Sequence, residues 1–172
     1  KDYVTFPIVR NEHRNNILHM TIAPAEVSED VAKEAHELAL RLAQGFELAG
    51  ILAIELFVTK DERVIVNELA PRPHNSGHYT IEACSFDQFD AHIRGIAGWP
   101  LEQPELLKPA VMVNVLGQHV APTRALIAEH PEWNMHDYCK AEVRHDRKMG
   151  HITVLTDDTR QTVADLERTG CW

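Results

Sequence analysis

The sequence predicts an α+β protein, and three observations lead to this prediction. Residues 28–46 repeat apolar side chains at helical spacing, and residues 50–59 and 63–69 are two strand-like segments around a short polar one. Beyond residue 109, strand-like and helical segments follow one another to the C-terminus. Helices that pack on antiparallel strands are typical of this fold class.

The first helix is predicted from its ends as well as from its period. Ser28 is a good N-cap, Glu29 and Asp30 suit the first turn, and Gly45 is a stop signal. Six apolar residues lie on one face: Ala32, Ala35, Leu38, Ala39, Leu42 and Ala43. We expect this face to pack in a core.

The two strand-like segments predict a hairpin, because only the polar segment "KDE" separates them. A two-residue loop at Asp61 and Glu62 would place Glu55 directly opposite Glu68. Six apolar residues would then share the other face, which we expect to be a core face: Leu52, Ile54, Leu56, Val58, Ile65 and Leu69.

Further elements follow in order. Ser85 and Gln88 have the spacing of a capping box, which predicts a helix through "FDQFDAHIRGIA" that ends near Gly98. The segment "LEQPELLKP" is the best candidate for a linker. After it we expect a strand at "AVMVNVLG", a short helix near "TRALIAEH", a loop-rich stretch, a strand at "HITVLTD" and a final helix at "TRQTVADLERTG".

Composition limits the class of function. The formal charge of −9 over 172 residues argues against a nucleic-acid or anionic-membrane surface. Three cysteines, Cys84, Cys139 and Cys171, lack a paired spacing and predict free thiols in a reducing cytosol. No apolar run approaches the ~20 residues of a membrane span. We therefore expect a cytoplasmic protein with small-molecule ligands.

The two glutamates of the hairpin are the first candidate site. Carboxylates directly opposite each other, with Cβ atoms ~5 Å apart, repel unless something compensates. A divalent cation would compensate, and Mg²⁺ usually binds through one or two carboxylates together with substrate phosphates. Glu55 and Glu68 are thus candidate magnesium ligands for a nucleotide. The alternative is that both are solvent-exposed or paired with lysines.

The stretch "NELAPRPHNSGHYT" is the second candidate. Pro71 and Pro73 restrict the backbone on each side of Arg72, whose guanidinium matches an oxyanion such as phosphate or bicarbonate. His74 and Asn75 add donors. The alternative is a stiff loop whose histidine caps a carbonyl group. The prolines argue against a helix, and so against a zinc site made by the two histidines of this stretch.

The third candidate is the basic segment "KAEVRHDRK", residues 140–148, which holds Lys140, Arg144, Arg147 and Lys148. A run of charges is commonly a solvated face. This run, however, leads directly into a strand, and loops at strand ends often contact ligands.

These motifs resemble a known family. "NELAPRPHNSGHYTIEAC" and "FDQFDAHIRGIAGWPL" are similar to the signature region of the 5-(carboxyamino)imidazole ribonucleotide synthetases, the ATPase-subunit type of phosphoribosylaminoimidazole carboxylase. "HRNNILHMTIAPA" and "KAEVRHDRKMGHITV" are similar to this family as well. The family belongs to the ATP-grasp superfamily. The resemblance implies the C-terminal portion of an ATP-grasp domain at residues 1–100 and a small α/β C-terminal domain at 101–172.

The resemblance also implies roles for single residues. Glu55 and Glu68 would bind Mg²⁺ or Mn²⁺, and Asn67 would lie beside them at the nucleotide. Arg72, His74 and Asn75 would surround bicarbonate or the carboxyphosphate formed from it.

In the last segment, Lys140 and Arg147 would hold the phosphate of aminoimidazole ribonucleotide, with Lys140 near the carboxylation site. Two departures fall in this loop. Cys139 stands where a glycine is common, and His145-Asp146 stands where the family often has Pro-Gly. The exact placement of Arg147 is the assignment that these departures affect.

The implied reaction is a carbon–nitrogen ligation in purine biosynthesis. ATP phosphorylates bicarbonate, and the exocyclic amine of aminoimidazole ribonucleotide is then carboxylated. The chain resembles only the C-terminal half of such an enzyme, so we expect it not to turn over alone. Family likeness also allows a homodimer. Two alternatives stay open: a formate-dependent glycinamide ribonucleotide transformylase-like enzyme, and a non-catalytic fragment.

Overall fold

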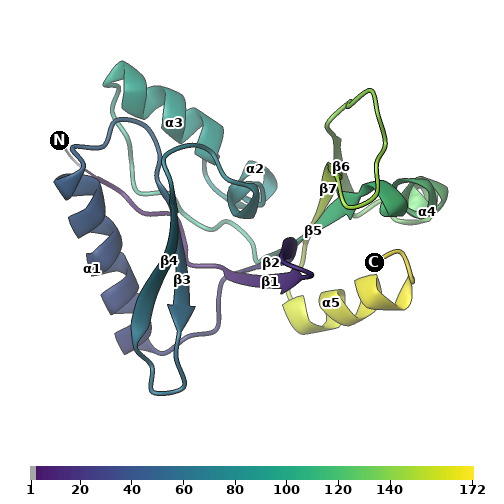
Figure 1. The fold of residues 1–172 in the computed structure, drawn as a ribbon, viewed down its shortest axis with the longest axis horizontal. Coiled ribbons are helices and arrows are strands. Elements are labelled where there is room, and N and C mark those ends of the chain that lie inside the picture. The colour runs from purple at the N-terminus through teal and green to yellow at the C-terminus, as the bar shows by residue number, and fades with distance from the viewer. Residues whose placement is uncertain (1–2) are drawn as a thin grey trace. The chain divides into compact units, whose positions relative to one another are not determined.

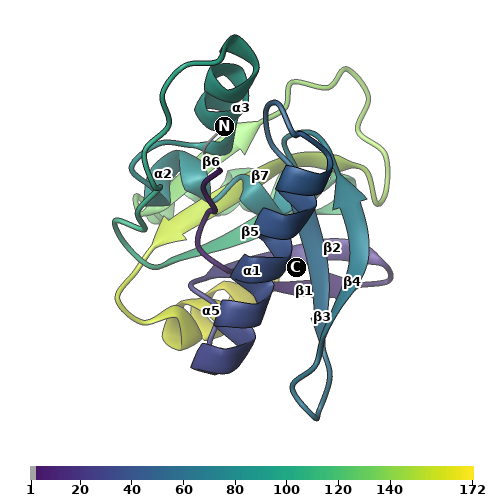
Figure 2. The same ribbon diagram turned by 90° about the vertical axis from the view of Figure 1, so that its left-hand side faces the viewer.

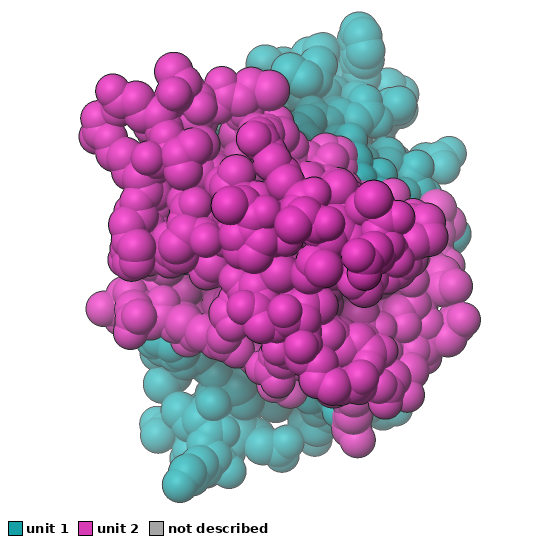
Figure 3. Space-filling view, turned by 90° about the vertical axis from the view of Figure 1, so that its right-hand side faces the viewer, with its two compact units in different colours: residues 1–8, 25–106 teal, residues 9–24, 107–172 magenta. Residues whose placement is uncertain are grey.

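The computed structural model describes residues 3–172, and the chain forms two compact units. Unit 1 contains residues 1–8 and 25–106, and unit 2 contains residues 9–24 and 107–172 (Figure 3). Both units combine antiparallel strands with helices, which confirms the α+β prediction. None of the helices in residues 3–172 is long and apolar enough to span a bilayer.

Unit 1 consists of a hairpin and three α-helices. Its elements are α1 Glu29–Gly45, β3 Ala53–Val58, β4 Val64–Ala70, a 3-10 turn Asn75–Gly77, α2 Thr80–Ala83 and α3 Gln88–Ala97. Helix α1 lies along the hairpin (Figures 1 and 2). Its predicted N-cap is confirmed, because the Ser28 hydroxyl accepts a hydrogen bond from the backbone N–H of Val31.

The hairpin has the predicted Glu55–Glu68 pair but not the predicted loop. Near the turn Val58 pairs with Val64, so the loop is one residue longer than the two-residue loop we expected. Asn67 is then an extra residue on β4, between the pairs Leu56–Val66 and Glu55–Glu68. This β-bulge returns the register to the predicted one. The two departures cancel where the glutamates lie.

The expected core face of the hairpin is wrong near the turn, whereas Leu52, Ile54, Leu56 and Leu69 are half-buried. Val58 and Ile65 are 47% and 44% exposed, although the sequence placed both in a core. In the observed register Phe57 pairs with Ile65 and Val66 lies on the same face as Val58, so Val58 and Ile65 are on different faces, and Phe57 and Val66 are exposed as well. The exposed residues lie toward the turn, where the register also departs from the predicted one, and the bulge at Asn67 restores the predicted register only beyond them.

The start of α3 also differs from the expected capping box. Asp87, not Ser85, is the N-cap, and its carboxylate accepts hydrogen bonds from the N–H groups of Phe89 and Asp90. Ser85 instead accepts a hydrogen bond from the backbone of Glu105. Gln88 is buried, with other partners. The predicted end is confirmed, because Gly98 closes the helix in the left-handed conformation.

Unit 2 is built on a five-stranded antiparallel sheet of order β1-β2-β5-β7-β6. The strands are β1 Arg10–Arg14, β2 Ile17–Ala23, β5 Ala110–Leu116, β6 Trp133–Asp137 and β7 Lys148–Leu155. The helices are α4 Val120–Leu126 and α5 Thr159–Arg168, with 3-10 turns at Gly117–His119 and Ile127–Glu129. One face of the sheet and α5 form an apolar core: Met20, Ile22, Val111, Val113, Val115, Trp133, Ile152, Val154 and Leu166.

Three strands of this sheet were not predicted. β1 and β2 come from the N-terminal part of the chain, and β6 lies in the stretch that we expected to be loop-rich. Since β2 pairs with β5, residues 9–24 belong to unit 2, although most of the first hundred residues belong to unit 1. The compact units thus differ from a division at residue 100. The assignment of residues 1–100 and 101–172 to domains of the family stays a prediction.

Candidate functional site

The carboxylate pair of unit 1 lies at the bulge. Glu55 and Glu68 are paired across the hairpin, and Asn67 lies between them as the extra residue of β4. The Asn67 side chain donates a hydrogen bond from Nδ2 to Glu55 Oε2 over 3.2 Å. A regular strand would point Asn67 to the face opposite Glu68, so the bulge is what brings this amide to the carboxylate.

His74 meets the same carboxylate from the loop that follows β4. Its Nε2 lies 3.8 Å from Glu55 Oε1, and the two side chains are only 14% and 17% exposed. His74 Nδ1 accepts a hydrogen bond from the backbone N–H of Ser76, which leaves the ring proton on Nε2, toward Glu55. The Ser76 hydroxyl adds a second contact to Nδ1 at 2.8 Å.

The rest of the proline-flanked segment is more open. Arg72 is exposed, and its Nη1 donates a hydrogen bond to the carbonyl oxygen of Pro73. This contact holds the guanidinium against its own loop and leaves further N–H donors for an anion. Asn75 begins the 3-10 turn and is half-buried. The structure therefore gathers the sequence-predicted residues of unit 1 around the end of β4.

The fit of a metal ion can be tested on the donors present. Among residues 3–172 no group of three or more His, Cys, Asp or Glu side chains is arranged like a metal cage. Glu55 and Glu68 supply two carboxylates on one side. Mg²⁺ is commonly bound in this way, with substrate phosphates and water as the other ligands. The donor set fits magnesium with a nucleotide and does not fit a site made by protein alone.

One residue of this site was missed in the sequence. Gln88 is 2% exposed, and its carboxamide bonds the backbone of His74 through both its oxygen and its nitrogen. Its nitrogen also contacts His78 Nδ1 at 2.9 Å. The capping-box spacing gave Gln88 a different role. Its position next to a histidine-rich loop depends on tertiary contacts that no local pattern reveals.

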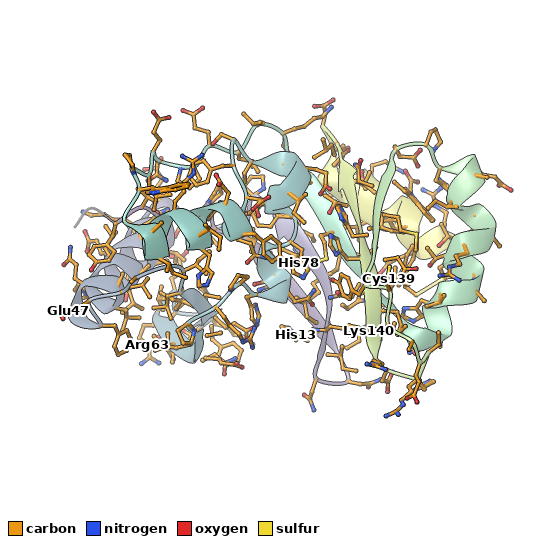
Figure 4. All side chains as sticks on the ribbon, turned by 90° about the horizontal axis from the view of Figure 1, so that it is seen from above. His13, Glu47, Arg63, His78, Cys139 and Lys140 are labelled. Atoms are coloured by element: carbon orange, nitrogen blue, oxygen red, sulfur yellow. The ribbon has the colours of Figure 1, made fainter. Side chains whose placement is uncertain are left out.

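The second cluster belongs to unit 2, after β6. Lys140 Nζ donates a hydrogen bond to the backbone carbonyl of Lys148 over 2.6 Å and lies 5.4 Å from the ring centre of Tyr138. Cys139 and Lys140 lie next to each other in Figure 4, and both line a cavity of about 260 Å³. Asp137 also lines this cavity. Its pKa is lowered mainly by a hydrogen bond from the Cys139 backbone N–H, and to a smaller extent by one from the Arg124 side chain.

Arg147 is held by main-chain contacts. Its Nη1 donates a hydrogen bond to the carbonyl of Glu142, and its backbone N–H bonds the carbonyl of Arg144. Asp146 next to it exchanges two hydrogen bonds with the Gln118 side chain. These hydrogen bonds fix the backbone of the basic loop at Asp146 and Arg147, and the Arg147 side chain is exposed.

The two departures from the family pattern have the same backbone conformation. Cys139 has φ of 52° and Asp146 has φ of 60°, both in the left-handed region. Glycine adopts this region without penalty, and aspartate does so more readily than most residues. A glycine at either position would suit the same backbone.

All three cysteines are free thiols, as predicted. Burial raises the pKa of Cys84 to about 11, which keeps this thiol protonated and unreactive at neutral pH. Cys139 is the exposed one. Elsewhere in unit 2, burial lowers the pKa of His19 from 6.5 to about 4, so this imidazole is neutral at physiological pH.

Comparisons with known proteins bear on both units. The family model described as the ATP-grasp domain matches residues 1–89, and the model described as the phosphoribosylaminoimidazole carboxylase C-terminal domain matches residues 110–165. N5-carboxyaminoimidazole ribonucleotide synthase of Staphylococcus aureus is 48% identical over 94% of the chain. The enzyme of Staphylococcus saprophyticus is 47% identical over the same share. The chain spans 43% of the length of these relatives.

Solved structures give the same result. The Staphylococcus aureus N5-carboxyaminoimidazole synthetase complexed with ADP matches 97% of the chain with a TM-score of 0.91 and 46% identity. The Aspergillus clavatus enzyme, in complex with ADP and aminoimidazole ribonucleotide, matches 96% with a TM-score of 0.89 and 32% identity. The chain covers 46% of each of those chains. These relatives confirm the resemblance seen in the motifs, and the chain belongs to the ATP-grasp family.

Proposed function

We propose that the complete protein containing this chain is an ATP-dependent carbon–nitrogen ligase. It carboxylates aminoimidazole ribonucleotide with bicarbonate, through carboxyphosphate, and releases ADP and phosphate. The names of its relatives support this class of reaction, as does a relative solved with ADP and aminoimidazole ribonucleotide. Because the chain spans less than half of its relatives, the activity belongs to the complete protein.

One observation carries the proposal at the level of side chains. The imidazole of His74 lies next to Glu55 of the Glu55–Glu68 pair, near the end of β4. Glu68 comes shortly before the segment Pro71–Pro73 in the chain, and His74 comes directly after it. Paired carboxylates suit a metal-bound nucleotide, and the adjoining Arg72 suits a reactive anion. A loop stiffened by two prolines holds the two functions next to each other.

The proposed metal ligands are Glu55 and Glu68, which would hold Mg²⁺ or Mn²⁺ with ATP. The metal would supply positive charge to the phosphates during phosphoryl transfer. Asn67 has two parts in this scheme. Its hydrogen bond orients the carboxylate of Glu55, and it would lie beside the bound nucleotide.

The proposed residues for bicarbonate and carboxyphosphate are Arg72, His74 and Asn75. Arg72 offsets the negative charge of the anhydride, and the Nε2–H of His74 is a directed donor next to it. In unit 2, Lys140 and Arg147 would hold the phosphate of aminoimidazole ribonucleotide, with Lys140 also close to the amine that is carboxylated. Lys140 already lies on a cavity wall, in a defined conformation.

We also propose that the complete protein works in the cytoplasm, with ATP, bicarbonate and aminoimidazole ribonucleotide as its small-molecule partners and with no nucleic acid or membrane partner. A homodimer is the assembly proposed for it.

The test is a product assay on the complete protein in carbonate-free buffer with ATP and Mg²⁺. We expect phosphate release to require both aminoimidazole ribonucleotide and bicarbonate, and ¹³C-bicarbonate to give a new carbamate signal by NMR. Formate with glycinamide ribonucleotide is the matched control, and we expect no product from it. A protein that uses formate and leaves bicarbonate untouched would overturn the proposal.

A further inference from the structure

The loop that carries His74 is held by one buried amide. Gln88, the first residue of α3, is 2% exposed and lies against the segment 74–78. Its Oε1 accepts a hydrogen bond from the His74 backbone N–H, and its Nε2 donates one to the His74 carbonyl, both over 2.8 Å. The side chain of Gln88 therefore bonds both the N–H and the carbonyl group of His74.

The remaining hydrogen of this amide is used as well. Nε2 lies 2.9 Å from His78 Nδ1, and an amide nitrogen can only donate, so His78 Nδ1 accepts. The His78 ring then stacks on Phe89, the residue after Gln88, with ring centres 5.7 Å apart. His78 is labelled in Figure 4. The loop is thus bound to the start of α3 at two positions, His74 and His78.

Gly77 leaves the space that this amide needs. A Cβ atom at Gly77 would lie 2.4 Å from Gln88 Oε1 and 2.7 Å from its Cδ, which is far inside van der Waals contact. The loop and the carboxamide therefore fit each other closely. Thr80 completes the contact, since its hydroxyl donates to the Gly77 carbonyl and accepts from the Gln88 backbone N–H.

We infer that Gln88 is a positioning residue, which acts through His74. The two bonds to its backbone hold His74 in an extended conformation, with φ of −123° and ψ of 151°, directly before the 3-10 turn. From this backbone the imidazole reaches to 3.8 Å from Glu55 Oε1, while Ser76 holds the proton on Nε2. Gln88 thus sets the place of the donor, and Ser76 sets its tautomer. This inference rests on the role proposed for His74 in carboxylation.

The first test is Gln88→Glu in the complete protein. The variant keeps the shape and the acceptor for the His74 N–H, but it loses both donors. We expect kcat to fall by about 100-fold, as for other small displacements of a reacting group. The KM for ATP should stay within about twofold, since Gln88 contacts no group assigned to the nucleotide. Gln103→Glu is the matched control, because Gln103 is exposed and bonds Thr5 instead, and it should retain kcat.

A second set of variants decides the question even if Gln88→Glu does not fold. Gly77→Ala places a methyl group where the carboxamide lies, whereas Gln88→Ala removes the carboxamide. If both changes act through the same contact, the combined variant should be no less active than the less active of the two single variants. Losses that multiply, or a Gly77→Ala variant with unchanged kcat, would overturn the inference.

NMR separates this inference from the proposed function. The ¹⁵N shifts of the His74 ring report its contacts with Ser76 and Glu55, which depend on where the ring lies, and they need no substrate. We expect Gln88→Glu to alter them and Gln103→Glu to leave them as they are. Unaltered shifts in Gln88→Glu would refute the positioning role, whatever the enzyme carboxylates. Failure of the wild-type protein to carboxylate the ribonucleotide, with these shifts altered as expected, would refute the proposed function alone.

Discussion

Replacing Glu68 with glutamine should have opposite effects on stability with and without metal. Glu68 is exposed and lies directly opposite Glu55. Two unit charges about 5 Å apart in water repel by about 0.8 kcal/mol, and physiological salt reduces this to about 0.4 kcal/mol. Without metal, Glu68→Gln removes this repulsion and should raise the free energy of unfolding by about 0.4 kcal/mol.

With metal the order should reverse. A ligand present at 100 times its Kd stabilises the folded state by about 2.7 kcal/mol. Glutamine leaves only one carboxylate at the pair, so the variant should lose most of that gain. The assay is urea denaturation of the complete protein with constant ADP, in excess EDTA or in excess MgCl₂. The variant should unfold at higher urea in EDTA, and the wild type at higher urea in magnesium.

A control of equal charge makes this reversal specific. Glu102→Gln removes one negative charge from an exposed loop of the same unit. It should behave as the wild type does in both buffers, apart from small effects of net charge. If Glu68→Gln gains as much from magnesium as the wild type, Glu68 is not a metal ligand. If it is less stable in EDTA, the repulsion between the two carboxylates is not the dominant interaction there.

Three further outcomes are expected. Lys140→Ala in the complete enzyme should raise the KM for aminoimidazole ribonucleotide by about 10–100-fold, as loss of a charged hydrogen bond does. ADP binding, measured by calorimetry, should not change, and the control Lys108→Ala should leave both quantities unchanged. Loss of ADP binding in Lys140→Ala would contradict the division of roles. Cys139→Gly should raise the free energy of unfolding by about 0.5 kcal/mol, since holding cysteine in the left-handed conformation costs more than glycine's extra chain entropy. Urea denaturation measures this, and a lower midpoint than that of the wild type would contradict it. The pKa of His19 is lowered to about 4, so its unfolded form binds a proton first and stability should fall from pH 6.5 to pH 4; a His19→Asn variant with an equally steep fall in denaturation midpoint would count against it.

Local patterns in the sequence were sufficient for much of unit 1. The apolar period and the Ser28 cap placed α1, and alternating side chains put Glu55 and Glu68 on one face of a hairpin. The family resemblance came from contiguous motifs, which survive without any knowledge of the fold. These features could be predicted because each depends on residues close together in the chain.

Other features depend on partners far apart in the sequence. β2 joins the sheet by pairing with β5, about ninety residues later, and no local signal marks that pairing. The exposure of the turn end of the hairpin likewise depends on which other elements are available to cover it, because burial is a property of the packed molecule.

The candidate site combines both kinds of information. Its carboxylates were predictable from the strand period. The hairpin loop is one residue longer than predicted, however, and only the observed strand pairing shows that the bulge at Asn67 compensates for this residue. Gln88 and His74 are fourteen residues apart and meet because α3 packs on the loop. Sequence alone therefore named the chemical groups and their family. Their distances came from tertiary structure, because close packing decides which buried donor meets which acceptor.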